Sequence, residues 1–420
     1  MLRQCPFAID PSGRDIHAEA ARLRELGPAV RVTLPGGVQG WAVAGHHALR
    51  KLLADPRVSK DAYRHWPAWI SGEVGPEWPL AIWVSVQNMI TAHGAEHTRL
   101  RRLALKAFTL RRVAAMRPRI DEVVAEVLDE LARRPGDEPV DVRAHFAHEV
   151  PTRIIFELFG IPEWARARLY KIINGFFDTA ISAEDAHRNG VDLYETMGEL
   201  VSHKRAHPAE DLTSGLIAAR DDEDGAQLTE KELVDNLILL FTAGYETSVN
   251  LISSAVHELL AHPSQLELIR SGLASWEDAV EETLRRQPPA ANAILRYAVE
   301  DIDVEGTVIP KGDPIIVSLA SAGRDPQVHG ADADDFDITR ATRSDHMAFG
   351  FGPHYCMGAT LSRLEAAVAV SALFGRFPGM SLAVPPQGLG RVESFISNGL
   401  RELPVRLGPD TVQESGVPHS

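Results

Sequence analysis

The sequence is poor in cysteine, and this scarcity excludes several kinds of site. Only two of its 420 residues are cysteines, Cys5 and Cys356, so a framework of several disulfides is not possible. Two cysteines also cannot supply the four thiolates of a zinc site or of an iron–sulfur cluster. A single disulfide between the two cysteines remains open at this point.

Long apolar runs and positive charge are scarce as well. No stretch reaches the roughly 18 uninterrupted apolar residues that a membrane span needs, and the opening MLRQCPFAIDPSGRD carries charges where a secretion signal is apolar. The 43 Lys and Arg stand against 58 Asp and Glu, which gives a formal net charge of −15. An acidic chain binds nucleic acids and anionic membranes poorly. We therefore expect a cytoplasmic protein with no nucleic-acid and no membrane partner.

The organisation of the chain is mostly helical. No linker or internal repeat divides it, so we expect one domain over 1–408 and a disordered tail over 409–420. A hairpin is expected over 28–45, and short strands within 292–319 and 381–407. Apolar residues recur at helical spacing over 94–134, 141–160, 163–181, 184–206, 211–220, 229–261, 275–286 and 357–375. The predicted fold class is mainly α with minor β-sheets.

The helix over 229–261 has two local features. Thr229 and Glu232 have the spacing of a capping box at its start. In its middle, LLFTAGYETS places Gly244, which costs about 1 kcal/mol relative to alanine inside a helix. Thr247 can donate to the carbonyl of Ala243 and open the helix locally. Taken alone, this segment also fits a core helix with a notch of small residues.

The segment FGFGPHYCMG, residues 349–358, precedes the helix over 357–375. A cysteine just before a helix lies near backbone N–H groups and the helix dipole, and both favour the thiolate. Gly352 and Gly358 allow the backbone to approach the sulfur closely. A lone thiolate is a poor zinc site but can be the axial ligand of haem iron. The alternative is a buried structural cysteine beside a glycine-rich turn.

This segment carries a resemblance to a known family. Its pattern Phe-x-x-Gly-x-His-x-Cys-x-Gly is similar to the haem signature of cytochromes P450, and all five fixed positions match. The resemblance, to bacterial class I P450s of actinomycete type, covers about residues 10–408 and implies the P450 fold. It implies haem b as the cofactor and Cys356 as the ligand of its iron. The further haem contacts that it implies are Phe349, Gly350 and Ala243, with His97, Arg101, Arg296 and His354 at the haem carboxylates.

The resemblance also assigns roles to two other motifs. Glu246 and Thr247 match the family's acid–threonine pair, which implies proton delivery to iron-bound dioxygen. Glu282 and Arg285, with Arg340, match a structural Glu–Arg–Arg motif that supports the loop before the cysteine. Without the resemblance, Glu282 and Arg285 are an ordinary surface ion pair. One departure is Gly323-Arg324-Asp325-Pro326, where the family often has Asn-Arg-Asp-Pro, which puts a small local hydrogen bond in doubt.

The implied reaction inserts one oxygen atom of O2 into a substrate. The chain has no GxGxxG segment and no iron–sulfur cysteines, so we expect electrons from NAD(P)H through ferredoxin reductase and ferredoxin. Candidate basic residues for docking the ferredoxin are Arg102, Arg111, Arg112 and Arg363. We expect a monomer. A peroxide-driven P450 normally lacks the acid–threonine pair, and a haem-thiolate gas sensor without turnover remains the alternative class.

The substrate is expected to be a bulky, mostly apolar small molecule. By family position, the residues that line its pocket are Val86, Gln87, Met89, Leu239, Leu240, Ala243, Ala291, Asn292, Ile294, Phe395 and Ile396. None is basic, so a fatty acid finds no partner for its carboxylate. A steroid is favoured, with macrolide or polyketide-like products of secondary metabolism next. The Trp-rich stretch over 65–91 resembles an actinomycete subfamily with such substrates, or its tryptophans merely pack the loop.

Overall fold

The computed structural model describes residues 6–134, 138–176, 183–222 and 225–411. The chain forms two compact units, each made of several segments. The first unit comprises Met1–Thr98, Glu281–Cys356 and Arg391–Gly399, and the second comprises Arg99–Val280, Met357–Gly390 and Leu400–Ser420. Cys5 and most of the predicted tail lie outside the described residues. The single domain predicted over 1–408 stays a prediction.

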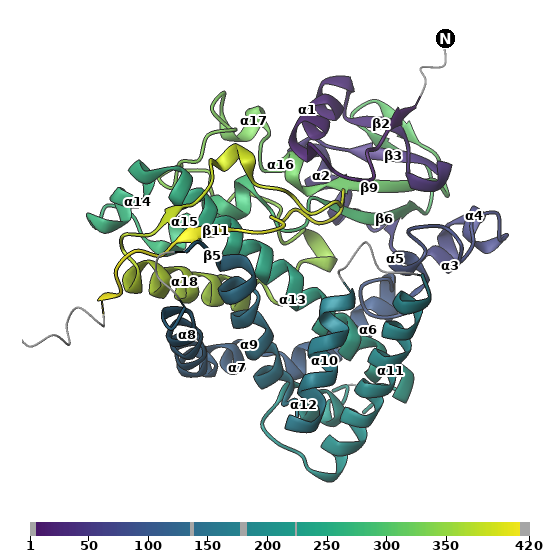
Figure 1. Cartoon of the computed structure of the whole chain (residues 1–420). Helices are drawn as coiled ribbons and strands as arrows, with labels where there is room; N and C mark the ends of the chain where they lie inside the picture. Colours follow the sequence, from purple (N-terminus) through teal and green to yellow (C-terminus); the bar gives the residue numbers. More distant parts are fainter. Residues whose placement is uncertain (1–5, 135–137, 177–182, 223–224, 412–420) are drawn as a thin grey trace, which may run out of the picture. The chain divides into compact units, whose positions relative to one another are not determined.

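The first unit is built around a six-stranded sheet in the order β1-β2-β3-β9-β6-β4. Figure 1 labels its four middle strands, β2, β3, β9 and β6. The strands are β1 (Phe7–Ala8), β2 (Ala29–Thr33), β3 (Gln39–Val43), β4 (Val58–Ser59), β6 (Asn292–Ala298) and β9 (Pro314–Ser318). Strands β2 and β3 pair antiparallel, Ala29 opposite Val43, so the hairpin predicted over 28–45 is confirmed. A separate hairpin joins β7 (Ile302–Val304) to β8 (Thr307–Ile309).

Short helices make up much of the rest of the first unit. They are α1 (Ile16–Leu26), α2 (His46–Ala54), α3 (Ala62–His65), α4 (Pro67–Ile70), α5 (Ile82–Ser85), α16 (Leu319–Ala322), α17 (Pro326–His329) and the 3-10 turns η1 (Pro35–Gly37) and η3 (Gly352–His354). Trp66 and Trp78 lie in the core against the sheet, and Trp66 stacks on Tyr297 with ring centroids 5.4 Å apart. At least these two tryptophans therefore pack the loop, as the alternative interpretation of the Trp-rich stretch requires.

The second unit is helical. Its elements are α7 (Leu110–Ala115), α8 (Arg117–Ala132), η2 (Arg143–Ala147), α9 (Glu149–Phe159), α10 (Glu163–Phe176), α11 (Ala183–Ala206), α12 (Leu212–Ala218), α13 (Glu230–Ala261), α14 (Pro263–Arg270), α18 (Ala359–Arg376) and η4 (Pro386–Gly388). The small sheet β10-β11-β5 is formed by β5 (Val140–Asp141), β10 (Ser381–Leu382) and β11 (Pro404–Arg406). Helix α13 packs against α9, α11 and α18. The predicted class, mainly α with minor sheets, is confirmed.

Local sequence explains where the main helices begin and end. The capping box is confirmed: the Thr229 hydroxyl accepts from the Glu232 N–H, and the Glu232 carboxylate accepts from the Thr229 N–H at 2.8 Å. The helical pattern predicted over 94–134 is confirmed, and three helices share this range. Helix α6 (Gly94–Ala107) ends before Thr109, which caps α7, and Pro118 lies at the start of α8, where a proline stops the preceding helix.

Helix α6 begins in the first unit and ends in the second, whereas α15 (Trp276–Arg286) begins in the second and ends in the first. Among the described residues, no helix combines the length and the apolar character that a membrane crossing requires.

Candidate functional site

The loop that carries Cys356 belongs to the first unit and is shaped by glycine. Gly350 and Gly352 have φ values of 71° and 72°, in the left-handed region that favours glycine. A Cβ on Gly352 would lie 2.5 Å from the carbonyl oxygen of Leu53, so no side chain fits there. The Cys356 N–H donates to the Phe349 carbonyl at 2.9 Å and closes the loop. Cys356 itself is exposed, so the alternative of a buried structural cysteine is wrong.

Three of the four residues expected at the haem carboxylates lie in this same unit. The rings of His97 and His354 are 4.0 Å apart between centroids, although 257 residues separate them in the chain. Arg296, on β6, is 7% exposed, and its Nη1 has no hydrogen-bond partner among the described residues. Burial lowers the pKa of Arg296 to about 10. Arg101 follows His97 by one helical turn on α6 but belongs to the second unit.

These residues fit the cofactor that the resemblance implies. A buried guanidinium with an open N–H donor is costly unless an anion binds it, and a haem carboxylate is such an anion. An exposed cysteine at the end of a closed loop can present its sulfur to iron. Phe349 and Gly350, expected as haem contacts, are half-buried beside it.

Helix α13 places the acid–threonine pair in the second unit. The Thr247 hydroxyl donates to the Ala243 carbonyl at 2.7 Å, so the predicted bond within the helix is confirmed. Ala243 and Gly244 are exposed in the middle of this 32-residue helix, and Glu246 and Thr247 are half-buried. Tyr245 and Ser248 are buried on the other side. The helix therefore offers an open strip of small residues with an acid and an alcohol beside it.

A buried acid next to this segment was missed by sequence reasoning. Glu365 on α18 is 4% exposed, and Ser248 donates to its Oε2 at 3.4 Å. Its Oε1 has no hydrogen-bond partner among the described residues, and burial raises the pKa of Glu365 to about 8. The signal available in the sequence was a single acid inside the apolar run LEAAVAV.

The Glu282, Arg285 and Arg340 side chains form a buried scaffold in the first unit. Arg285 donates to both carboxylate oxygens of Glu282 at 2.7 Å, and both side chains are 0% exposed. Arg285 also donates to the carbonyls of Gly323, Ala333 and Asp335. Arg340 Nε lies 3.6 Å from Glu282 Oε1. The alternative of a surface ion pair is therefore wrong.

The departure at Gly323 is explained by this scaffold. A Cβ at position 323 would overlap the carbonyl oxygen of Arg285. In this chain, only a glycine at position 323 lets the backbone lie this close to the Arg285 carbonyl oxygen.

The residues expected around the substrate come from both units. In the first unit, the start of β6 lies against the late turn: the Ala291 N–H donates to the Ile396 carbonyl at 2.8 Å. The Asn292 side chain donates to the Phe395 carbonyl at 2.6 Å, so one of the two expected polar handles is engaged within the protein. Ala291 is 0% exposed and packs with Ile16 and Ala320, which leaves it no surface for a substrate.

The other expected substrate residues differ in exposure. Met89, Ile294 and Phe395 are buried, and Gln87 is exposed. Val86, Ile396 and, on α13 of the second unit, Leu239 and Leu240 are half-buried.

Comparison with known proteins gives consistent matches. The family model described as Cytochrome P450 matches residues 192–386. The 2-hydroxy-5-methyl-1-naphthoate 7-hydroxylase of Streptomyces carzinostaticus is 45% identical over 403 residues, 96% of this chain and 98% of that enzyme.

Solved structures agree with the sequence matches. CYP154A1 from Streptomyces coelicolor A3(2) is 48% identical with a TM-score of 0.87, covering 96% of this chain and 100% of that one. CYP154C4 from Streptomyces sp. ATCC 11861 is 42% identical with a TM-score of 0.91, covering 96% and 99%. The predicted P450 fold is therefore confirmed. With the cysteine loop and nearly full-length relatives that are named hydroxylases, this chain belongs to the cytochrome P450 family and is a monooxygenase.

Proposed function

We propose that this monooxygenase is a class I enzyme that inserts one oxygen atom of O2 into a rigid, mostly apolar ring compound. A steroid is the favoured substrate, and macrolide or polyketide-like compounds come next. The observation that carries the proposal is the exposed Cys356 on a closed loop in the unit that also holds His97, His354 and Arg296, whose Nη1 has no partner among the described residues. Haem b, when bound, supplies the binding and activation of O2.

The chain's own residues have separate tasks in this proposal. The Cys356 thiolate holds the iron, and the carboxylates of haem are held by Arg101, Arg296 and the two histidines. The half-buried Thr247 hydroxyl, which donates to Ala243, keeps its lone pairs to accept a hydrogen bond from water. Glu246 precedes it on the helix and exchanges protons with solvent.

The substrate class is supported by the relatives and by the composition of the expected pocket. CYP154C4, 42% identical, was solved in a steroid-bound form, and the naphthoate hydroxylase is named for a fused aromatic ring. The 6-deoxyerythronolide B hydroxylase of Saccharopolyspora erythraea, 37% identical, is named for a macrolide precursor. A rigid molecule loses little conformational entropy when it enters an apolar pocket. With Asn292 engaged by Phe395, Gln87 is the remaining expected polar contact.

Electrons are proposed to come from NAD(P)H through ferredoxin reductase and ferredoxin. Of the candidate docking residues, Arg102 pairs with Asp221 at 2.5 Å and Arg112 donates to the Ala107 carbonyl. Arg111 is exposed, and we place the strongest effect of charge reversal there. Arg111→Glu raises the apparent KM for ferredoxin most at low salt, because exposed charges are screened at high salt.

The thiolate ligand is tested by Cys356→His. The reduced, CO-bound wild-type enzyme shows the thiolate-specific Soret band, whereas the variant binds haem without this band. A normal thiolate spectrum in the variant would overturn the proposal. Oxygen uptake coupled to product, with ferredoxin and its reductase present, then separates an enzyme from a gas sensor.

The proton-delivery role is tested by Thr247→Ala, for which the helix offers a matched control. Thr242, five residues earlier on the same helix, donates to the Ile238 carbonyl at 2.9 Å in the same way. We expect Thr247→Ala to keep NAD(P)H consumption but divert it to peroxide, while Thr242→Ala keeps wild-type product per NAD(P)H. If both variants form the same amount of product per NAD(P)H, Thr247 does not have this role in proton delivery.

A further inference from the structure

Two buried cations of the first unit lie near each other: Lys60 directly follows β4, and Arg296 lies on the neighbouring strand β6. Strands β4 and β6 pair antiparallel, with Val58 opposite Ala298 and Ser59 opposite Tyr297. Continuing this register by one residue sets Lys60 opposite Arg296, on the same face of the sheet. Lys60 is 8% exposed and Arg296 is 7% exposed.

This arrangement is unfavourable in the protein alone. Like charges directly opposite on paired strands repel, and a buried charge without a counter-ion is costly. Burial, and then the charge of Arg296, hold the pKa of Lys60 well below its usual range. In the described part of the chain, Lys60 has no hydrogen bond or ion pair.

The nearest carboxylate in sequence is already engaged. Asp61 accepts from the Arg64 N–H at 3.2 Å and caps α3. The two buried cations therefore need an anion, and the described part of the chain supplies neither of them with one.

We propose that Lys60 and Arg296 together bind a single carboxylate, that of a haem propionate. This inference rests on the proposed haem site and adds Lys60 to the residues expected there. The guanidinium can donate two N–H bonds to one carboxylate, and the ammonium adds a point charge beside it. The haem carboxylate is favoured because Arg296 shares its unit with His97, His354 and Cys356. The same chemistry would bind the carboxylate of an aromatic acid substrate, and the test separates the two sources.

The test measures haem loss from the holoenzyme by transfer to excess apomyoglobin. Lys60→Met, which keeps an unbranched side chain without the charge, loses haem at least about tenfold faster than wild type, because a hydrogen bond to a charged group is lost. Lys60→Arg loses haem as slowly as wild type, and Lys60→Gln loses it at an intermediate rate. Lys51→Met is the control, since Lys51 is an exposed lysine of the same unit with a side chain that is 78% exposed.

The outcomes decide between the two carboxylates. Unchanged haem loss in Lys60→Met and Lys60→Gln overturns the proposal. If haem loss is unchanged but the spectral response to 1-naphthoate is lost, the carboxylate belongs to a substrate, and the haem assignment is equally overturned. If Lys60→Met gives no holoenzyme, the comparison of Lys60→Gln with Lys60→Arg decides. The CO spectrum of each sample shows whether the thiolate haem site itself is intact, so failure here is distinct from failure of the proposed function.

Discussion

Arg285 and Arg296 are both buried arginines of the first unit, but their surroundings differ. Arg285 has a carboxylate and three backbone carbonyls as partners. Arg296 has an Nη1 without a partner among the described residues, and its charge acts on a second buried cation, Lys60. A buried charge with all its partners inside the protein maintains the fold, and one without them points to a ligand. Burial alone does not separate these two roles, but a count of partners does.

The largest expected effect is at Arg285. Arg285→Met leaves the buried Glu282 carboxylate and three carbonyls without their donor, and breaking such a pair costs about 3–5 kcal/mol. We expect loss of folded protein, measured by the yield of holoenzyme and by urea unfolding. Arg168→Met is the control, because its pairs with Glu195 and Glu199 are largely exposed and worth less than about 1 kcal/mol. Equal stability of the two variants would break the comparison.

A smaller effect on folding, with a large effect on haem, is expected at Arg296. Arg296→Met removes a charge that no described residue satisfies, so helical content by circular dichroism stays near wild type. Haem transfer to apomyoglobin becomes at least about tenfold faster. If this variant instead unfolds as Arg285→Met does, the two arginines have the same structural role.

Glu365 extends the comparison to acids. Its pKa is raised from 4.5 to about 8 by burial, so the folded protein keeps a proton that the unfolded chain has released. The contribution of the protonated Glu365 to the free energy of unfolding is complete below about pH 4.5. It is lost as the pH rises toward 8, by up to about 1.4 kcal/mol per pH unit. Glu365→Gln should flatten this part of the stability profile from thermal unfolding. The exposed Glu25→Gln should leave the slope unchanged, and a persistent slope in Glu365→Gln would place the titrating group elsewhere.

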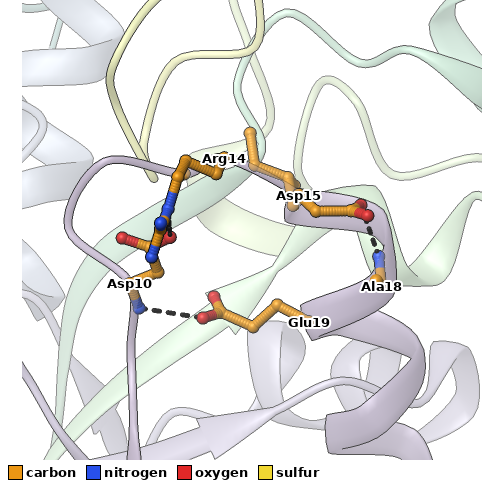
Figure 2. A pocket seen from close by; sticks show the side chains of 7 residues that line it. Asp10, Arg14, Asp15, Ala18 and Glu19 are labelled. Carbon is orange, nitrogen blue, oxygen red and sulfur yellow. Dashed lines mark hydrogen bonds and ion pairs between the residues drawn. The ribbon is translucent and has the colours of Figure 1, made fainter.

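The smallest effect is expected at the surface, in the acidic pocket at the start of α1 (Figure 2). Asp10 is bonded by Ser12 and Arg14, and these bonds lower its pKa to about 2, with Ser12 the larger cause. Arg14→Ala should raise the pKa of Asp10 only part of the way to 3.8, measured by NMR titration of the carboxyl. The melting temperature should not change. A full return to 3.8 would mean that Ser12 contributes nothing.

The parts of the site that could be predicted depend on residues close in sequence. The cysteine loop and the Thr247 bond to Ala243 follow from glycine positions and helical spacing, which a single segment contains. The break at Thr109 was also local, but strong apolar periodicity on both sides obscured it.

The parts that could not be predicted depend on distant segments. The position of Lys60 opposite Arg296 depends on the register of two strands more than 230 residues apart in the chain. The Asn292 amide is engaged because it donates to the carbonyl of Phe395, which is 103 residues further along the chain. Strand pairing and side-chain partners of this kind are fixed by tertiary structure.

The close approach at Gly323 bears on how this enzyme can be engineered. Consensus design replaces unusual residues by the family's common ones and often stabilises a protein, on the assumption that positions contribute independently. Here the common asparagine would require a Cβ where the Arg285 carbonyl oxygen lies. The glycine and that carbonyl therefore constrain each other. A consensus substitution at position 323 would bring in a side chain for which this backbone has no space.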